Sequence, residues 1–272
     1  MCKRSEAAKD PLLDIFLQRY QLNLLSVPRA GADVGELYVH DGKRAGSPGQ
    51  LASFLARPFV MPPVNRGEAM AALQGLASNS VSIDVGVGLL GSFLSGFGVA
   101  VPVGDVKARW RAKGARHARF RMGAAVRDSV DPGKFGVALI GNGLRADHPL
   151  VDPASRYYAV TGVARCKSLT IALADEHGHV VELGADLPWV GDVKVGVEVA
   201  RGLAGEVTIS GDKLLAFGVE LYELVARGER IRMRLPDGAL TVRSMREAAA
   251  RPIPALIGGD DGEVFIDLAD KE

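Results

Sequence analysis

Apolar and polar residues alternate in several parts of the chain, and this period-two pattern is typical of β-strands with one apolar and one polar face. The clearest alternation runs from Val81 to Val87 and predicts a strand there. A second predicted strand covers Val99 to Val103, and a third covers Ala118 to Met122, where Arg119 and Arg121 occupy the polar face. Such strands can lie on a soluble core, or place their apolar face in lipid within a closed barrel.

The rest of the pattern predicts many strands and a few short helices. The predicted strands cover residues 22–27, 35–40, 158–173, 193–199, 206–210 and 214–225, and residues 175–179 form a predicted hairpin turn. Helices are predicted over residues 12–20, where Asp10 and Pro11 form a start signal, over residues 68–77, and after the turn at 131–133. Residues 47–49 indicate a turn and 57–65 an extended connector. We therefore expect an α+β fold with a twisted, mainly antiparallel central sheet and short peripheral helices.

Charge is distributed unevenly along the 272 residues, although the net charge is only +1. Residues 252–272 contain six acidic residues and one lysine, so this tail carries −5 and residues 1–251 carry +6. No apolar run reaches the ~20 residues that a transmembrane helix needs, and the N-terminus has no signal-peptide core. We expect the inactive chain to be cytoplasmic.

Several motifs suggest chemistry, but each has a simpler interpretation. Residues 86–91 match the glycine fingerprint of dinucleotide-binding folds, yet no other strand–helix–strand alternation accompanies them. His177 and His179 flank a turn glycine without further metal ligands, and Cys166 lies in a strand-like run without an activating partner. We expect no catalytic residue, no metal and no soluble cofactor, and hence no enzyme.

A basic run follows the second alternating segment, with no acidic residue between Lys107 and Arg121. It allows three interpretations: a solvated face, a nucleic-acid patch, or a surface that meets anionic lipid headgroups. Trp110 and Phe120 are the only aromatic residues within it, which gives little support to nucleic-acid binding. A lipid surface fits the charge distribution better, and the predicted headgroup contacts are Lys107, Arg109, Arg111, Arg119 and Arg121.

The late segment Leu214–Leu224, with the sequence LLAFGVELYEL, resembles a strand of the pore-forming domain of gasdermins. The early segments 22–28 and 35–42, together with 158–169, resemble the bacterial branch of that family. The resemblance covers about residues 10–226, and it rests on strand patterns rather than on catalytic signatures. It implies a gasdermin-like pore-forming domain, with hairpins from residues 81–122 and 157–200 that refold into a membrane.

The resemblance also implies a mode of activation. Gasdermins are stored inactive until a protease releases a domain that oligomerises into membrane pores, and bacterial members carry a short inhibitory tail and an acylated N-terminal cysteine. Here Cys2 would carry the acyl chain, expected to be palmitoyl, although a lone terminal cysteine can equally be incidental. The expected partners are an activating protease, membrane lipids and further copies of the chain. The expected site of action is the inner membrane, where pores would cause cell death in defence against phage.

This interpretation divides the chain into a pore-forming domain (1–242), a cleavable linker (243–251) and an autoinhibitory tail (252–272). The linker is small, polar and charged, and its basic candidate cut sites are Arg243, Arg246 and Arg251, although either a caspase-like or a trypsin-like protease is compatible with it. The expected tail contacts are its apolar residues: Leu256, Ile257, Val264, Phe265, Ile266 and Leu268. Two rival classes stay open, namely a soluble β-rich binding module and a nucleotide-dependent enzyme.

Overall fold

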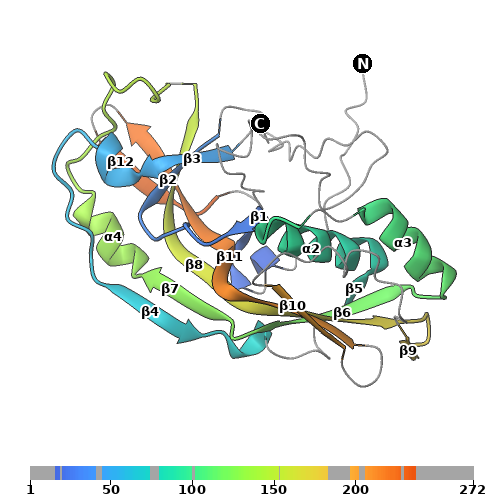
Figure 1. Ribbon diagram of the computed structural model, residues 1–272. Helices are drawn as coiled ribbons and strands as arrows, with labels where there is room; N and C mark the ends of the chain where they lie inside the picture. Colours follow the sequence, from blue (N-terminus) through green and yellow to red (C-terminus); the bar gives the residue numbers. More distant parts are fainter. Residues whose placement is uncertain are drawn as a thin grey trace, which may run out of the picture.

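Two long antiparallel strands, β8 (Arg156–Ala174) and β11 (Glu206–Arg227), form the middle of one large sheet (Figure 1). The computed structural model describes residues 16–18, 20–40, 45–73, 80–99, 102–152, 154–182, 197–201, 206–227 and 230–236. Register between β8 and β11 runs from Glu206 opposite Ala172 to Leu224 opposite Tyr157, with three shifts along the way. These shifts let the long pair bend and twist.

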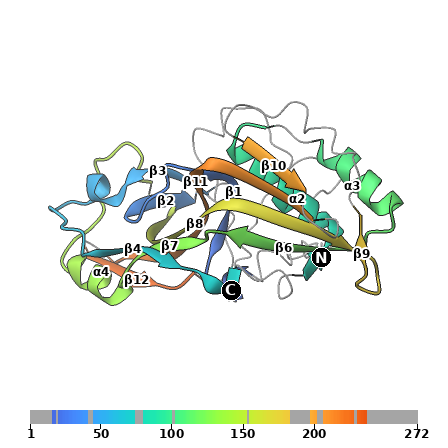
Figure 2. The same ribbon diagram turned by 60° about the horizontal axis from the view of Figure 1, so that its bottom comes forward.

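Shorter strands lie end to end along both outer edges of this pair. β2 (Glu36–His40), β7 (Val126–Val130) and β6 (His117–Gly123) pair in succession with β8. The outer edge of β11 pairs with β12 (Arg230–Arg234), β1 (Asn23–Arg29) and β10 (Val197–Arg201). Further out lie β3 (Ala45–Gln50) on β2, β4 (Val64–Ala69) on β7, and β5 (Ser80–Ser82) on β6, while β9 (Val180–Val181) forms a hairpin with β8 (Figure 2).

The longest described helix, α2 (Ile83–Gly96), lies across one end of the sheet beside α3 (Val103–Ala112) (Figure 1). The Ser82 hydroxyl caps its start by accepting the Val85 amide at 3.4 Å. At its end Gly98 has a φ of +75°, its amide bonds to the Ser95 carbonyl, and the Val99 amide bonds to the Leu94 carbonyl. These two bonds form a Schellman motif, in which glycine takes the left-handed position.

Two apolar clusters divide the core between the two ends of the molecule. One packs α2 against the sheet and includes Phe93, Phe120 and Ile171. The other includes Tyr38, Phe54 and Tyr158 and lies beneath the 3-10 helix η1 (Leu51–Phe54) and the short helix α4 (Pro132–Ala138). The Asp131 carboxylate caps α4 by accepting the Lys134 amide at 2.7 Å.

Most predicted strands are confirmed, among them residues 22–27, 35–40, 118–122 and 158–173 with the turn at 175–179. The predictions for 206–210 and 214–225 are confirmed as one continuous strand, β11. The helix expected after 131–133 is α4, and the short piece of 12–20 that is described, 16–18 with Tyr20, is helical.

Four predictions were wrong in the residues that the structure describes. The alternating segment 81–87 is a strand only as far as Ser82 and then becomes α2, and Val103 begins α3. Residues 47–49 belong to β3, where a register shift next to Pro48 lets an edge strand accommodate proline. In place of the helix predicted over 68–77, β4 extends to Ala69 and is followed by the 3-10 turn η2 (Ala71–Leu73), while residues 74–77 lie outside the described part of the chain.

Candidate membrane-inserting region

The end of the sheet beneath α2 has an apolar face. Along β6, the side chains of Ala118, Phe120 and Met122 are fully buried. Phe120 lies opposite Ile171 of β8, and Ile171 lies opposite Val207 of β11. An apolar row therefore crosses three adjacent strands on the side that α2 covers.

The neighbouring row of the same strands is polar and lies on the opposite face. Arg121 pairs in register with Thr170, and Thr170 with Thr208. The two threonine hydroxyls are 2.8 Å apart, and Arg121 Nε donates to Thr170 Oγ1 at 3.2 Å. Arg121 also lies 3.6 Å from a Glu206 carboxylate oxygen. This part of the sheet is thus amphipathic across several strands.

Glycines let α2 lie very close to its neighbours. A Cβ atom at Gly86 would be only 2.3 Å from the Cβ of Ala118 on β6, and one at Gly96 would be 2.6 Å from the Pro28 carbonyl oxygen. A Cβ atom at Gly91 would be 2.9 Å from the Cγ2 of Val103 on α3. Any larger residue must push the helix away from the sheet or from α3. Gly86 and Gly91 of the fingerprint are therefore packing positions, and the whole fingerprint lies inside a helix and does not form a phosphate-binding turn.

The five predicted headgroup residues lie on two different elements. Lys107, Arg109 and Arg111 belong to α3, whereas Arg119 and Arg121 belong to the face of β6 turned away from α2. Arg119 donates to the Gly178 carbonyl at 3.4 Å, in the turn between β8 and β9. The structure does not gather the five into one patch.

On α3, two of the three basic residues are held by one carboxylate. Asp84 is in the first turn of α2, and its carboxylate lies 3.2 Å from Lys107 Nζ. Each of its two oxygens also accepts a hydrogen bond from Arg111 Nη2 at 2.9 Å. The Arg109 side chain is exposed and makes no ion pair with any residue in the described part of the chain.

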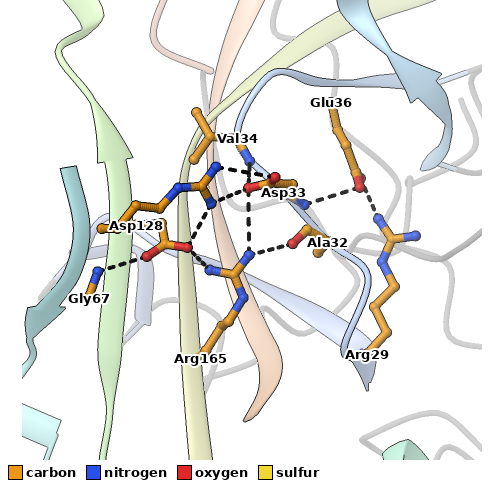
Figure 3. A network of polar contacts seen from close by, with 9 residues as sticks. Arg29, Ala32, Asp33, Val34, Glu36, Gly67, Asp128 and Arg165 are labelled. Carbon is orange, nitrogen blue, oxygen red and sulfur yellow. Dashed lines mark hydrogen bonds and ion pairs between the residues drawn. The ribbon is translucent and has the colours of Figure 1, made fainter. Parts of the chain in front are cut away.

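A charge cluster that the sequence did not predict fixes the turn between β1 and β2 (Figure 3). Arg66 of β4 contacts Asp33 of this turn at 2.7 Å and Asp128 of β7 at 3.0 Å. Arg165 of β8 pairs with Asp128 and donates to the Ala32 carbonyl at 2.6 Å. Arginines of β4 and β8 therefore hold the turn directly, and Asp128 of β7 bridges these two arginines.

The cluster keeps its carboxylates charged. Burial raises the pKa of Asp128, but the Gly67 amide at 2.8 Å and the guanidinium groups of Arg66 and Arg165 more than offset this, so the pKa lies below its usual value. Asp33 shows the same balance, with its pKa lowered by Arg66 and by the Val34 amide against burial.

Glu220 of β11 is in the opposite situation. Its carboxylate packs on Gly162 of β8, where a Cβ would lie 2.6 Å away, and it contacts Arg127 of β7 at 2.6 Å. Burial raises the pKa of Glu220, and Arg127 offsets this only in part.

The described residues hold little that suggests catalysis. Burial raises the pKa of the Cys166 thiol to about 12, which makes it a poor nucleophile. His179 contacts Asp175 at 3.2 Å in the exposed turn between β8 and β9, and the described ranges contain no group of three or more His, Cys, Asp or Glu side chains placed to hold a metal. Among these same ranges, no helix combines the length and apolar character required to cross a membrane.

Several predicted site residues lie outside the described part of the chain. They are Cys2, the linker residues Arg243, Arg246 and Arg251, and the tail residues Leu256, Ile257, Val264, Phe265, Ile266 and Leu268. The predicted division at 242 and 251 lies outside it too.

Comparison with known proteins gives consistent results. The model of the Bacterial Gasdermin Family matches residues 25–230. The chain is 27% identical over 242 residues to the gasdermin bGSDM of Vitiosangium sp. (strain GDMCC 1.1324), covering 86% of this chain and 88% of the relative. It is 26% identical over 261 residues to the gasdermin bGSDM of Lysobacter enzymogenes, covering 89% and 91%. The solved structure of a bacterial gasdermin from Bradyrhizobium tropiciagri shares the fold, with a TM-score of 0.63 at 18% identity over 85% of this chain and 95% of that one.

The structure is thus a β-rich α+β fold with an open, mainly antiparallel sheet, in which a helix seated on glycines covers the apolar face of one end. The family match extends over most of the chain and includes this region. The protein belongs to the bacterial gasdermin family, and gasdermins are pore-forming proteins.

Proposed function

We propose that this chain is an autoinhibited pore-forming protein. Proteolytic removal of its C-terminal tail would release a domain that oligomerises and inserts β-hairpins into the inner membrane. The resulting pores would cause cell death, with defence against phage as the expected setting. Before cleavage the protein would stay in the cytoplasm.

The amphipathic end of the sheet is the observation that carries this proposal. Lipid requires that every backbone polar group be paired within the protein, and closed rings of strands meet this condition. The row Phe120–Ile171–Val207 would face lipid, while the row Arg121–Thr170–Thr208 would face the water-filled lumen. A tilted spanning strand needs about 9–11 residues, and β6 has seven, so the strand must lengthen on insertion. Residues 83–87 have a β-like pattern, although they are folded as the start of α2. They directly follow β5, the partner of β6, and can extend β5 when β6 lengthens.

Charge and tethering support a tail-based switch. The tail carries −5 and the remainder +6, so the two attract each other. A covalently attached tail has a high effective concentration at its site, and one cut converts this contact into ordinary bimolecular binding. Palmitoylation of Cys2 would add an anchor, because each buried CH₂ contributes ~0.8 kcal/mol.

Dye release from liposomes tests the proposal directly. Residues 1–251 and the full chain are compared on vesicles that contain an anionic phospholipid, and Phe265→Asp in the full chain serves as a second way to weaken the tail. We expect rapid release by residues 1–251, release by Phe265→Asp, and none by the uncut full chain.

The soluble binding module makes the contrary prediction. If residues 1–251 remain monomeric and leave vesicles and bacterial cells intact, pore formation by this chain is refuted. Release by the uncut full chain at the same rate would instead refute autoinhibition by the tail.

A further inference from the structure

Asp84 connects the start of α2 to the basic face of α3. Its carboxylate is about one-third exposed and receives Arg111 Nη2 at 2.9 Å on both oxygens and Lys107 Nζ at 3.2 Å. Lys107 and Arg111 are four residues apart on α3, so they project from the same side of that helix. One carboxylate therefore holds two basic side chains together across the α2–α3 contact.

These two cations are the same groups that would meet an anionic membrane. A phosphate diester and a carboxylate both offer a guanidinium paired oxygens carrying one negative charge, so the two anions compete for the same hydrogen bonds. While Asp84 holds Lys107 and Arg111, its negative charge offsets part of their positive charge, so they attract a phosphate less strongly than free cations would. Arg109, on the same helix, is free of any ion pair with a described residue and can make the first contact with the lipid.

The consequence reaches α2. Asp84 is in its first turn, and the residues just after it, from Val85 onward, are buried against the apolar face of the sheet. Loss of Lys107 and Arg111 to lipid leaves Asp84 without either partner and loosens α3 from the start of α2. The start of α2 directly follows β5, which pairs with β6, and the inserting strands must form in this region.

We propose that Asp84 acts as an internal substitute for a lipid phosphate: it occupies Lys107 and Arg111 in the resting protein, and an anionic phospholipid headgroup replaces it at the membrane. Binding to anionic lipid is thereby coupled to release of α2. The inference rests on the proposed function, and it assigns to the same region both a lipid class and a trigger.

Asp84→Asn tests this proposal, because the change keeps the side-chain shape and removes the charge that holds the two cations. Asp105→Asn is the matched control. It removes the same charge from the exposed first turn of α3, where Asp105 has no ion pair with any residue that the structure describes. Both variants change the net charge equally, so a difference between them in vesicle binding is due to the release of Lys107 and Arg111.

The measurement is co-sedimentation of the uncut full chain with vesicles of phosphatidylglycerol and phosphatidylcholine, and with phosphatidylcholine alone, so it does not depend on pore formation. We expect Asp84→Asn to bind the anionic vesicles about fivefold more tightly than Asp105→Asn, as one additional lysine or arginine at an anionic surface would. The difference should vanish on phosphatidylcholine, at high salt, and when Arg111→Gln and Lys107→Gln are added to both.

Two results would overturn the proposal. Equal binding by Asp84→Asn and Asp105→Asn would mean that Asp84 does not withhold the cations from lipid. A gain by Asp84→Asn that is as large on phosphatidylcholine would mean that loosened packing, and not headgroup exchange, is responsible. A failure of residues 1–251 to release dye would refute pore formation but leave this binding comparison intact.

Discussion

The contact between Gly86 of α2 and Ala118 of β6 provides a sensitive probe of how the apolar face is covered. A Cβ at position 86 would be 2.3 Å from the Ala118 Cβ, well inside van der Waals contact. Gly86→Ala therefore forces α2 away from the sheet, and such overpacking costs about 1–3 kcal/mol. The gain in helix propensity from replacing glycine by alanine offsets about 1 kcal/mol of this.

Gly104→Ala is the control for helix propensity, because a Cβ at this exposed position in α3 has no atom within 4 Å. It should raise the free energy of unfolding by about 0.5–1 kcal/mol. Gly86→Ala should therefore be about 1–3 kcal/mol less stable than Gly104→Ala, both measured by urea unfolding of the full chain. When Gly86→Ala is introduced into residues 1–251, it should also speed dye release, because α2 leaves the sheet more readily.

A double mutant separates the steric contact from other effects. Ala118→Gly removes the methyl group that position 86 meets, so Gly86→Ala should cost less in that background, with a coupling energy of about 1 kcal/mol or more. If Gly86→Ala is instead as stable as Gly104→Ala, and Ala118→Gly changes nothing, α2 does not rest on β6 as described here.

Three further predictions address other parts of the molecule. Asp128→Asn should lower the free energy of unfolding at pH 7 by about 2 kcal/mol, because Arg165 loses a charged partner. In the folded protein the pKa of Asp128 lies below its usual 3.8, so this loss of stability should shrink as the pH falls through the lowered pKa. A loss of stability in urea unfolding that does not depend on pH would contradict this. Arg109→Gln should weaken co-sedimentation with anionic vesicles about fivefold and leave the unfolding curve unchanged, and undiminished binding would remove Arg109 from the lipid surface. Cys2 should carry a sixteen-carbon acyl chain in protein from the native host, and an intact mass equal to the unmodified chain would refute this.

The strands of the sheet could be predicted because their sequence pattern and their burial agree. In β6, the alternation of Ala118, Phe120 and Met122 with Arg119 and Arg121 corresponds to one covered and one uncovered face. The long strand β8 is strand-like over its whole length for the same reason. The antiparallel fold class followed from these segments and from the turns between them.

Helix α2 could not be predicted in this way, because it is buried almost all round. Apolar residues and glycines fill its sides, so residues 83–87 continue the period of two that begins in β5 but form a helix. The local signals for a helix were nevertheless present: Ser82 as a cap, Asp84 in the first turn, and Gly98 past the end. A pattern compatible with both structures is also what a segment that changes from helix to strand requires.

The charge cluster around the β1–β2 turn was beyond sequence reasoning for a different reason. Asp33, Arg66, Asp128 and Arg165 are separated by about 30 to 60 residues along the chain, and only strand order brings them together. The contacts of Asp84 were missed for a related reason: it lies more than 20 residues before the two basic residues that it holds, and the packing of α2 against α3 brings them together.

The proposed inserted state of β6 places adjacent residues of this strand in lipid and in water. It is tested most directly with Met122→Cys and Arg121→Cys, each in residues 1–251 carrying Cys2→Ser and Cys166→Ala, on anionic vesicles. Thiols are treated either with a charged, water-soluble reagent or with a reagent that partitions into the bilayer. We predict that position 121 reacts with the water-soluble reagent, and that position 122, buried in the resting protein, reacts only with the bilayer reagent once vesicles are present. If position 122 stays unreactive toward both reagents on vesicles, β6 keeps its resting cover and does not enter the membrane.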